Sequence, residues 1–345
     1  MQALILAGGK GTRLRPLTVY TPKPIVPVVN RPFILYQLDI LKRAGITDIT
    51  LSLSYQPDKL EHLLGDGSDL GFSIKYVTEP SPLGTAGAYR FAARADEPTI
   101  VVNGDILTDV DISKVLDFHR QKGAAATIVL APVADPGAYG LVEIDDEQNV
   151  CRFLEKPKGG QVTANGIKTI NAGIYVLEPE ILKLIPKGEN RSFEYDVFPE
   201  IIKKKISFSG FELSDEYWRD IGTCQSYLKA HHDFLDGRIK GFDLETTGVS
   251  EIATAAEVDK RSILGEGCVV KPGARVINSV IGAGVIIEEK AIVEDSVIWP
   301  HTRISTSAEI RGAIIGRGSH IGRNATVGEG SVLGDKASLP DYSRV

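Results

Sequence analysis

The chain is poor in cysteine, in long apolar runs and in net positive charge, and each shortage excludes a class of protein. Its three cysteines, Cys151, Cys224 and Cys268, lie far apart and are odd in number, so their spacing supports neither a disulfide framework nor a zinc motif. No apolar run reaches the roughly 18 residues of a membrane-spanning helix. The first apolar run is also too short for a secretory signal. We therefore expect a cytoplasmic protein without a membrane partner.

The charge balance argues against binding to nucleic acid. The formal net charge is −6 at pH 7, whereas nucleic-acid-binding domains carry a basic surface. A local cationic pocket is still compatible with this balance and would suit an anionic substrate. The length of 345 residues exceeds one typical domain and predicts two.

The most informative segment is the first one. A short apolar run, Ala3–Ala7, is followed by three glycines within Gly8–Gly11, which is typical of a buried parallel strand that enters a tight loop. Glycine lets the backbone approach a ligand closely, and Arg13 and Lys23 add cations suited to phosphate. The segment has no Walker lysine, and Leu14 breaks the dinucleotide fingerprint. It predicts a polyphosphate site of another kind or, taken alone, a plain turn.

Up to about residue 131, strands alternate with helices. We predict strands at 3–7, 49–53, 72–77, 99–103 and 124–130, and helices at 32–44, 58–64, 84–93 and 112–121. Such alternation indicates a parallel sheet with helices on both faces. Ligands of such sheets bind beyond the carboxyl ends of the strands. The Gly8 loop and Asp105 both lie at such ends.

The next hundred residues have a looser pattern. We predict strands at 141–144, 150–153, 167–176 and 207–212, and helices at 178–184, 195–204 and 223–236. We interpret this part as a lobe of the same domain that faces the first half across a cleft. The predicted boundaries are 1–236 for this domain, 237–254 for a linker and 255–345 for a second domain.

The second domain contains an internal repeat. Blocks that begin at Ser262, Ser279, Ser296 and Ala313 follow one another at 17 residues. Within them an aliphatic residue recurs every five or six positions, which predicts a three-sided coil. Stacked coils would bury a column of aliphatic side chains that no single repeat could bury. The pattern resembles the hexapeptide repeats of left-handed parallel β-helices.

Several motifs stand in one order along residues 1 to about 230. Besides the opening loop they are Pro22-Lys23-Pro24, Glu79-Pro80-Ser81-Pro82-Leu83-Gly84-Thr85-Ala86-Gly87, Asn103-Gly104-Asp105, Phe153-Leu154-Glu155-Lys156-Pro157, Asn171-Ala172-Gly173 and Trp218-Arg219-Asp220-Ile221-Gly222. Together they resemble the sugar-1-phosphate nucleotidylyltransferases, and a β-helix tail occurs in one subgroup. Two of the motifs are most similar to those of mannose-1-phosphate guanylyltransferases, although Leu154 stands where that motif usually has valine.

The resemblance implies a fold and a reaction. The fold would be a Rossmann-like, mixed or parallel sheet followed by a left-handed β-helix. The reaction would convert a nucleoside triphosphate and a sugar 1-phosphate into a nucleotide sugar and pyrophosphate, with Mg²⁺. A phosphate monoester is already ionised at neutral pH, so no general base is required. Such a site has to supply positioning and charge neutralisation.

The resemblance also assigns residues to roles. Asp105 and Asp220 match the magnesium carboxylates, although in isolation they would be interpreted as a helix cap and a surface turn. The catalytic cations would be Arg13, Lys23 and Lys156. The nucleotide site would comprise Leu6, Gly8, Gly9, Gly11, Thr12, Arg13, Lys23, Glu79, Pro82, Gly84, Thr85, Asn103 and Asp105. The sugar-phosphate site would comprise Gly140, Glu155, Lys156 and Asn171.

Glu79 bears on the choice of base. Thymidylyl and uridylyl relatives have glutamine here, whereas an ionised carboxylate only accepts hydrogen bonds. Guanine presents two adjacent donors, so the favoured reaction is GTP with mannose 1-phosphate. The alternative is UTP or dTTP with glucose 1-phosphate.

Two other classes of function are less favoured. A catalytically silent regulatory subunit would be indicated by loss of a catalytic cation or metal carboxylate, and all of them are present. An acyltransferase could use His301 or His320 on the β-helix, but no inserted loop covers an acyl donor. We interpret both histidines as surface residues and expect a homo-oligomer. The tail could serve structure, assembly or regulation.

Overall fold

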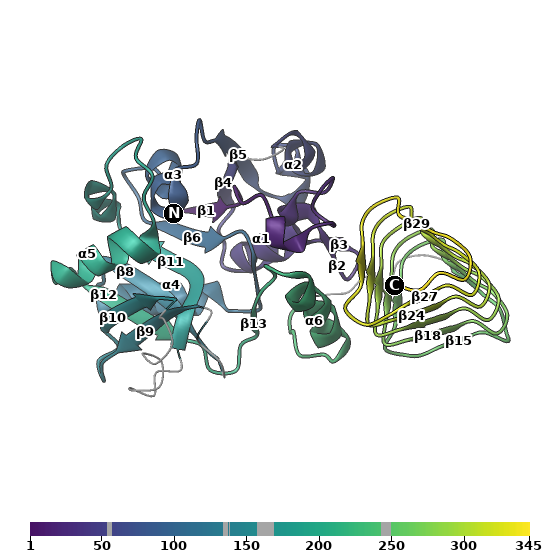
Figure 1. Cartoon of the computed structure of the whole chain (residues 1–345). Coiled ribbons are helices and arrows are strands. Elements are labelled where there is room, and N and C mark those ends of the chain that lie inside the picture. The colour runs from purple at the N-terminus through teal and green to yellow at the C-terminus, as the bar shows by residue number, and fades with distance from the viewer. Residues whose placement is uncertain (54–56, 134–136, 138, 157–168, 243–249) are drawn as a thin grey trace. The chain divides into compact units, whose positions relative to one another are not determined.

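The computed structural model describes residues 1–345 except 54–56, 134–136, 138, 157–168 and 243–249 (Figure 1). Residues 167 and 168 of a predicted strand, Pro157 and residues 243–249 of the predicted linker therefore lie outside the described residues. The chain forms two compact units, one of residues 1–9 and 36–218, the other of residues 10–35 and 219–345. Every helix in the described part is too short or too polar to cross a membrane.

The first unit is built on one large sheet. Its strands run in the order β10-β9-β11-β6-β1-β4-β5, with β8 paired to β11 and β12 paired to β8. Their bounds are β1 (Gln2–Leu6), β4 (Asp48–Leu53), β5 (Ser73–Thr78), β6 (Thr99–Asn103), β8 (Ala126–Pro132), β9 (Gly140–Ile144), β10 (Val150–Glu155), β11 (Thr169–Leu177) and β12 (Phe208–Glu212); β7 (Ile106–Thr108) is a separate short strand. The predicted α/β sheet is confirmed.

The sheet is mixed, which confirms the predicted Rossmann-like fold with a mixed or parallel sheet. Strands β1, β4, β5 and β6 are parallel neighbours. Strand β11 is antiparallel to both β6 and β8, so it separates the two. The strands after residue 139 join this same sheet instead of forming a lobe of their own. A fully buried apolar run pairs equally well with either sheet edge, so strand order does not follow from the pattern.

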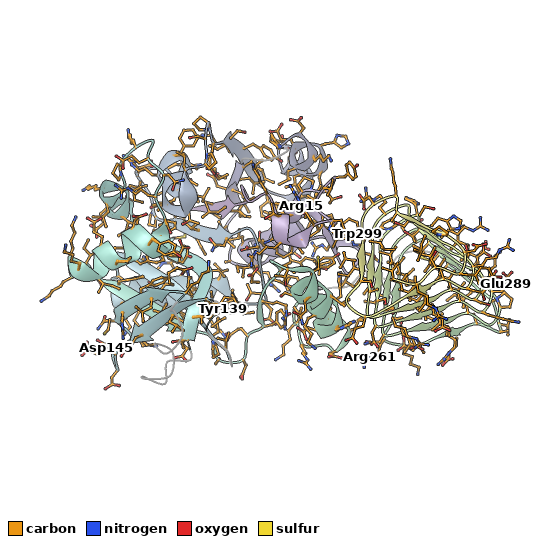
Figure 2. The ribbon with its side chains drawn as sticks, in the orientation of Figure 1. Arg15, Tyr139, Asp145, Arg261, Glu289 and Trp299 are labelled. Atoms are coloured by element: carbon orange, nitrogen blue, oxygen red, sulfur yellow. The ribbon has the colours of Figure 1, made fainter. Side chains whose placement is uncertain are left out.

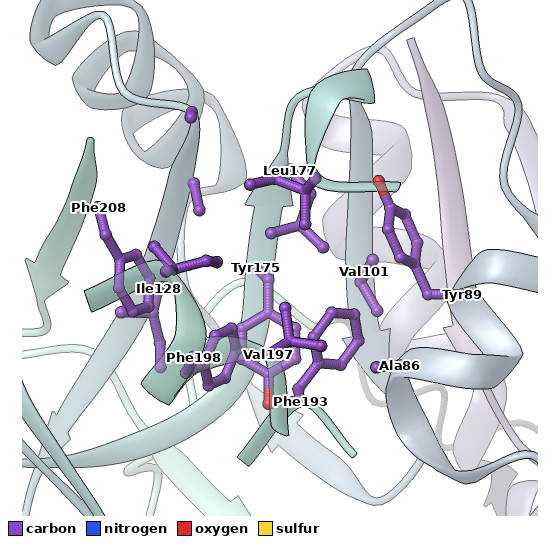
Figure 3. Close-up of a cluster of buried hydrophobic side chains, with 14 of the residues drawn as sticks. Ala86, Tyr89, Val101, Ile128, Tyr175, Leu177, Phe193, Val197, Phe198 and Phe208 are labelled. Atoms are coloured by element: carbon purple, nitrogen blue, oxygen red, sulfur yellow. The ribbon is translucent and has the colours of Figure 1, made fainter. Parts of the chain in front are cut away.

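Helices and aromatic side chains cover the sheet. The helices of this unit are α1 (Phe33–Arg43), α2 (Pro57–Leu64), α3 (Gly84–Ala92), α4 (Ile112–Lys122) and α5 (Phe198–Lys203), whereas α6 (Cys224–Leu235) belongs to the second unit. The predicted helix at 178–184 is a 3₁₀ segment, Pro179–Leu184, and Phe193–Val197 is a π-type turn before α5. In the core, the rings of Tyr175 and Phe193 lie 5.2 Å apart and those of Phe193 and Phe198 lie 5.4 Å apart (Figure 3).

The second unit contains a three-sided parallel coil. One sheet is β14 (Glu251–Ile252), β17 (Val269–Val270), β20 (Ile286–Ile287), β23 (Arg303–Ile304), β26 (His320–Ile321) and β29 (Ser338–Leu339). The second is β15 (Glu257–Val258), β18 (Arg275–Ile277), β21 (Ile292–Glu294), β24 (Glu309–Arg311) and β27 (Thr326–Val327). The third is β16 (Ile263–Leu264), β19 (Val280–Ile281), β22 (Val297–Ile298), β25 (Ile314–Ile315) and β28 (Val332–Leu333).

The register confirms the repeat. Ile263 pairs with Val280, Val280 with Val297 and Val297 with Ile314, each 17 residues further on. Inward aliphatics such as Ile287 are fully buried. His301 has a φ of 60° at a corner where neighbouring coils have glycine, as predicted. The same unit holds the segment 10–35, which includes β2 (Pro27–Val28) and β3 (Arg31–Pro32), and helix α6.

Candidate active site

Asp105 lies where β1 and β6 end together. Leu6 is the register partner of Asn103, and the amide of Gly104 donates to the carbonyl of Leu6 at 2.9 Å. The side chain of Gln37 braces this turn, because it donates to the carbonyls of Asn103 at 2.9 Å and Ile106 at 3.0 Å. The carboxylate-bearing turn is therefore fixed at the carboxyl edge of the sheet, where the sequence predicted it.

Glu79 is anchored at the same edge. One carboxylate oxygen accepts from the hydroxyl of Ser52 at 3.0 Å, and the other accepts from the backbone amide of Leu83 at 3.0 Å. Ser52, one residue before the end of β4, is the register partner of Leu6 in β1. These two bonds hold the carboxylate in one orientation, and each oxygen keeps acceptor capacity for a ligand. Ser52 was not predicted as a site residue from the sequence, although its place near the end of the predicted strand 49–53 could have indicated a position at the carboxyl edge of the sheet.

The nucleotide motif after Glu79 is held by the segment 189–194. The carbonyl of Pro82 accepts from the side chain of Asn190 at 2.7 Å. Gly84 begins α3, and the hydroxyl of Thr85 donates to the carboxylate of Glu194 at 2.9 Å. The structure thus adds Glu194, which carried no motif in the sequence.

The predicted sugar-phosphate residues meet on neighbouring strands. Gly140 of β9 is the register partner of Glu155 on β10, and a Cβ at position 140 would lie 2.6 Å from the Glu155 carboxylate. Any larger residue at position 140 would therefore displace this carboxylate. Burial raises the pKa of Glu155, and the Lys156 ammonium, 3.3 Å away, opposes that rise. On β11, the side-chain amide of Asn171 donates to the Tyr175 hydroxyl at 2.8 Å.

The second unit brings Arg13 and Asp220 together. A Cβ at Gly222 would lie 2.7 Å from the Arg13 guanidinium and 2.7 Å from the Asp220 carboxylate. Glycine at 222 therefore keeps open the space that both groups border. Ser226, in the first turn of α6, donates to the backbone carbonyl of Asp220. The charged ends of an arginine and a carboxylate border one small space, as a site for phosphate with a cation requires.

The loop in front of Arg13 is also ordered by its neighbours. Gly11 has a φ of 61°, and its carbonyl accepts from the Thr18 hydroxyl at 2.7 Å. Thr12 and Arg13 follow in a 3₁₀ turn, Thr12–Leu14. Lys23 begins a second turn, Lys23–Ile25, and is largely buried. The predicted residues Gly8 and Gly9 belong to the first unit and Gly11, Thr12, Arg13 and Lys23 to the second.

The donor set suits a hard cation held partly by substrate. In the described part of the chain, no three His, Cys, Asp or Glu side chains cluster tightly enough to bind a metal alone. Magnesium is commonly bound through one or two carboxylates together with phosphate oxygens and water. One carboxylate oxygen of Asp220 is buried beside Gly222. The predicted carboxylates Asp105 and Asp220 are therefore of the right type and number.

Comparison with known proteins decides the family. Residues 2–237 match the family model described as nucleotidyl transferase. The chain belongs to the nucleotidyl transferase family. Enzymes of this family generally use a divalent metal and small nucleotide and sugar-phosphate substrates. Residues 246–345 match the model described as the EIF2B subunit epsilon LbH domain, and with the three parallel sheets this gives a left-handed β-helix.

Relatives of this nucleotidyl transferase span most of its length. The mannose-1-phosphate guanylyltransferase of Mycobacterium tuberculosis is 37% identical over 299 residues, 84% of this chain and 81% of the relative. Mannose-1-phosphate guanylyltransferase 1 of Arabidopsis thaliana is 34% identical over 323 residues, 92% of this chain and 86% of the relative. A crystal structure from Bacillus anthracis, described as a glucose-1-phosphate thymidylyltransferase with sucrose, matches with a TM-score of 0.61 and 26% identity over 70% of this chain and 97% of that one.

Proposed function

We propose that this nucleotidyl transferase converts GTP and mannose 1-phosphate into GDP-mannose and pyrophosphate. The observation that carries the proposal is the similarity to the two mannose-1-phosphate guanylyltransferases, at 37% and 34% identity over 84% and 92% of this chain. The carboxylate of Glu79, fixed by Ser52 and Leu83, supports guanine because its oxygens can accept from two adjacent donors.

In the proposed reaction, an oxygen of the sugar phosphate attacks the α-phosphorus of GTP in line. One phosphorus–oxygen bond forms, the bond to the β-phosphate oxygen breaks, and pyrophosphate leaves with the electron pair. The cations Arg13 and Lys23 stabilise charge on the triphosphate, and Lys156 orients the attacking phosphate. Mg²⁺, held by Asp105 and Asp220, would neutralise charge on the phosphate oxygens when bound.

The site residues constrain the identity of the sugar less closely than that of the base. We propose that Glu155, Asn171 and the backbone of Gly140 bind its hydroxyl groups. The support is their common position on β9, β10 and β11 and the close approach of the Glu155 carboxylate to the backbone of Gly140. Lys156 next to Glu155 favours the ionised, acceptor form of that carboxylate.

One alternative has its own support. The matched crystal structure is described as a glucose-1-phosphate thymidylyltransferase, which favours dTTP or UTP with glucose 1-phosphate.

We also propose domains at 1–236 and 255–345 joined by 237–254, a homo-oligomer and a cytoplasmic location.

The test is a matrix assay of pyrophosphate release with Mg²⁺. GTP, UTP, dTTP, ATP and CTP are each paired with the 1-phosphates of mannose, glucose, galactose and N-acetylglucosamine. The fastest turnover is expected with GTP and mannose 1-phosphate. Turnover only with UTP or dTTP would replace the guanine assignment, and no turnover in any pair would reject the activity.

A further inference from the structure

One outer face of the β-helix is apolar and covered. Along the third sheet, the outward side chains of Val280, Val297 and Ile314 are only 1%, 2% and 2% exposed. Within the second unit, α6 lies beside the coil (Figure 1). Leu228 of α6 and Ile314 line one cavity of about 580 Å³. A solvated coil would have polar residues in this column, so the column is built to hold a helix.

A chain of hydrogen bonds runs through this contact to the segment that carries Lys23. The indole nitrogen of Trp299, on the β-helix (Figure 2), donates to the Tyr227 hydroxyl at 3.0 Å. The Tyr227 hydroxyl in turn donates to the backbone carbonyl of Pro27. Trp299 and Tyr227 are 1% and 0% exposed. Pro27 begins β2, directly after the turn Lys23–Ile25 and Val26.

A second bond ties the same segment to the coil. The side-chain amide of Asn30 donates to the carbonyl of Ile281 in β19 at 2.8 Å. Asn30 has a φ of 63°, a conformation that asparagine tolerates better than most residues. The hairpin that follows Lys23 is thus bonded to α6 at one end and to the β-helix at the other.

The helix α6 also fixes Asp220. Besides the bond from Ser226 to its carbonyl, the neighbouring Arg219 donates through two nitrogens to the buried carboxylate of Asp233, at 3.0 and 2.9 Å. Both nitrogens reach the same carboxylate oxygen, Oδ2, so a charge-assisted contact holds the Arg219 guanidinium against α6. The same helix therefore contacts the β-helix through Tyr227 and the Asp220 segment through Ser226 and Asp233.

We propose that Tyr227 and Trp299 are positioning residues, through which the β-helix orders the triphosphate-binding part of the site. Neither residue touches substrate in the proposed reaction. They act on Lys23 through Pro27, and on Asp220 through α6. The effect on catalysis rests on the proposed function. The ordering by the β-helix of residues 16–33, which contain Lys23 and the hairpin of β2 and β3, does not rest on it.

The experiment compares Tyr227→Phe with Tyr76→Phe in the full-length protein. Tyr76 is the matched control, because its hydroxyl also donates to a backbone carbonyl, that of Gly65 at 2.6 Å, within the first unit. We expect Tyr227→Phe to lower kcat about tenfold and to raise the KM for GTP, with the KM for mannose 1-phosphate unchanged. Hydrogen–deuterium exchange of peptides within 16–33 should become faster. Tyr76→Phe should change none of these values.

A second variant guards against misfolding of the first. Trp299→Phe removes the indole donor and should give the same split between the two KM values, and the double variant should lose less than the two single losses combined. Unchanged exchange within 16–33 in both single variants would overturn the proposal, as would an equal effect of Tyr76→Phe. If the wild type turns over no substrate pair, the proposed function fails, and the exchange measurement alone decides whether the β-helix orders this segment.

Discussion

The mixed sheet of the first unit and the β-helix of the second are both built on buried aliphatic residues, but they differ in how far apart in the sequence the paired strands lie. Strand β1 pairs with residues from 49 and from 99 onward, whereas most coil strands pair with residues 17 positions further on. The sheet collects unlike polar groups at its carboxyl edge. In the coil, serines form a uniform ladder: the amide of Ser279 donates to the hydroxyl of Ser262, and that of Ser296 to the hydroxyl of Ser279, each at 3.1 Å. The irregular strand order of the first unit brings together the polar groups of the candidate site, whereas the repeated coils of the β-helix form a regular support.

The largest effect is expected for a substitution in the sheet of the first unit, and it is an effect on activity. Asp105→Asn removes a proposed metal carboxylate at the sheet edge without changing side-chain volume. We expect kcat to fall by about 100-fold or more and the unfolding midpoint to stay the same. The exposed Asp117→Asn on α4 is the control, since its ion pair with Arg120 is solvated. A near-normal kcat for Asp105→Asn would show that the carboxylate does not bind the metal.

The next effect is on stability, in the repetitive unit. Ile287→Ala opens a cavity in the fully buried inner column and should lower the free energy of unfolding by about 2–5 kcal/mol. Its neighbour Ile286 points outward from the same strand and is partly exposed, so Ile286→Ala should cost less than about 1 kcal/mol.

Fluorescence can assign this loss to the second unit. The chain has two tryptophans, Trp218 in the first unit and Trp299 in the second. In a Trp218→Phe background, guanidinium unfolding followed by fluorescence reports on Trp299. Equal losses for Ile287→Ala and Ile286→Ala would mean that inward and outward positions of the coil are energetically alike.

The same difference explains what the sequence could predict. The coil follows from local rules: a 17-residue step sets most partners, so the burial of Ile287 and the corner position of His301 could be derived in advance. The strand order of the sheet does not follow from local rules. Strand β11 lies between β6 and β8, and this position depends on contacts between segments far apart in the sequence. For the site, glycine loops and charged motifs were visible. A supporting group such as Tyr227 was not, because nothing in the sequence around a buried tyrosine distinguishes a residue that supports a site from any other core residue.

Acid should loosen the scaffold through α6. Full burial, together with the neighbouring charge of His232, lowers the pKa of His231 from 6.5 to about 3. In the described part of the chain, its ring nitrogens have no hydrogen-bond partner, and its ring lies 4.5 Å from that of Tyr227. Because the folded state holds His231 neutral, its contribution to stability is complete above pH 6.5 and is lost as the pH falls toward 3.

The pH dependence can be measured with the same Trp299 signal. The free energy of unfolding should fall by up to about 1.4 kcal/mol for each pH unit below 6. His231→Leu should flatten this slope, and His62→Gln, at an exposed position on α2, should leave it unchanged. A slope that persists in His231→Leu would assign acid sensitivity to other groups.

The smallest effect concerns the choice of base at the sheet edge. Glu79→Gln keeps an acceptor for Ser52 but replaces one carboxylate oxygen by a donor, which then faces the amide of Leu83 or the base. We expect the ratio of kcat/KM for GTP to that for UTP to fall roughly 5- to 150-fold, equivalent to about 1–3 kcal/mol, because the new donor then faces a donor of guanine. Ser52→Ala frees the carboxylate without removing it and should lower the ratio less. A ratio unchanged in Glu79→Gln would mean that Glu79 only shapes the turn to Leu83, and that guanine is selected by backbone groups of the irregular unit.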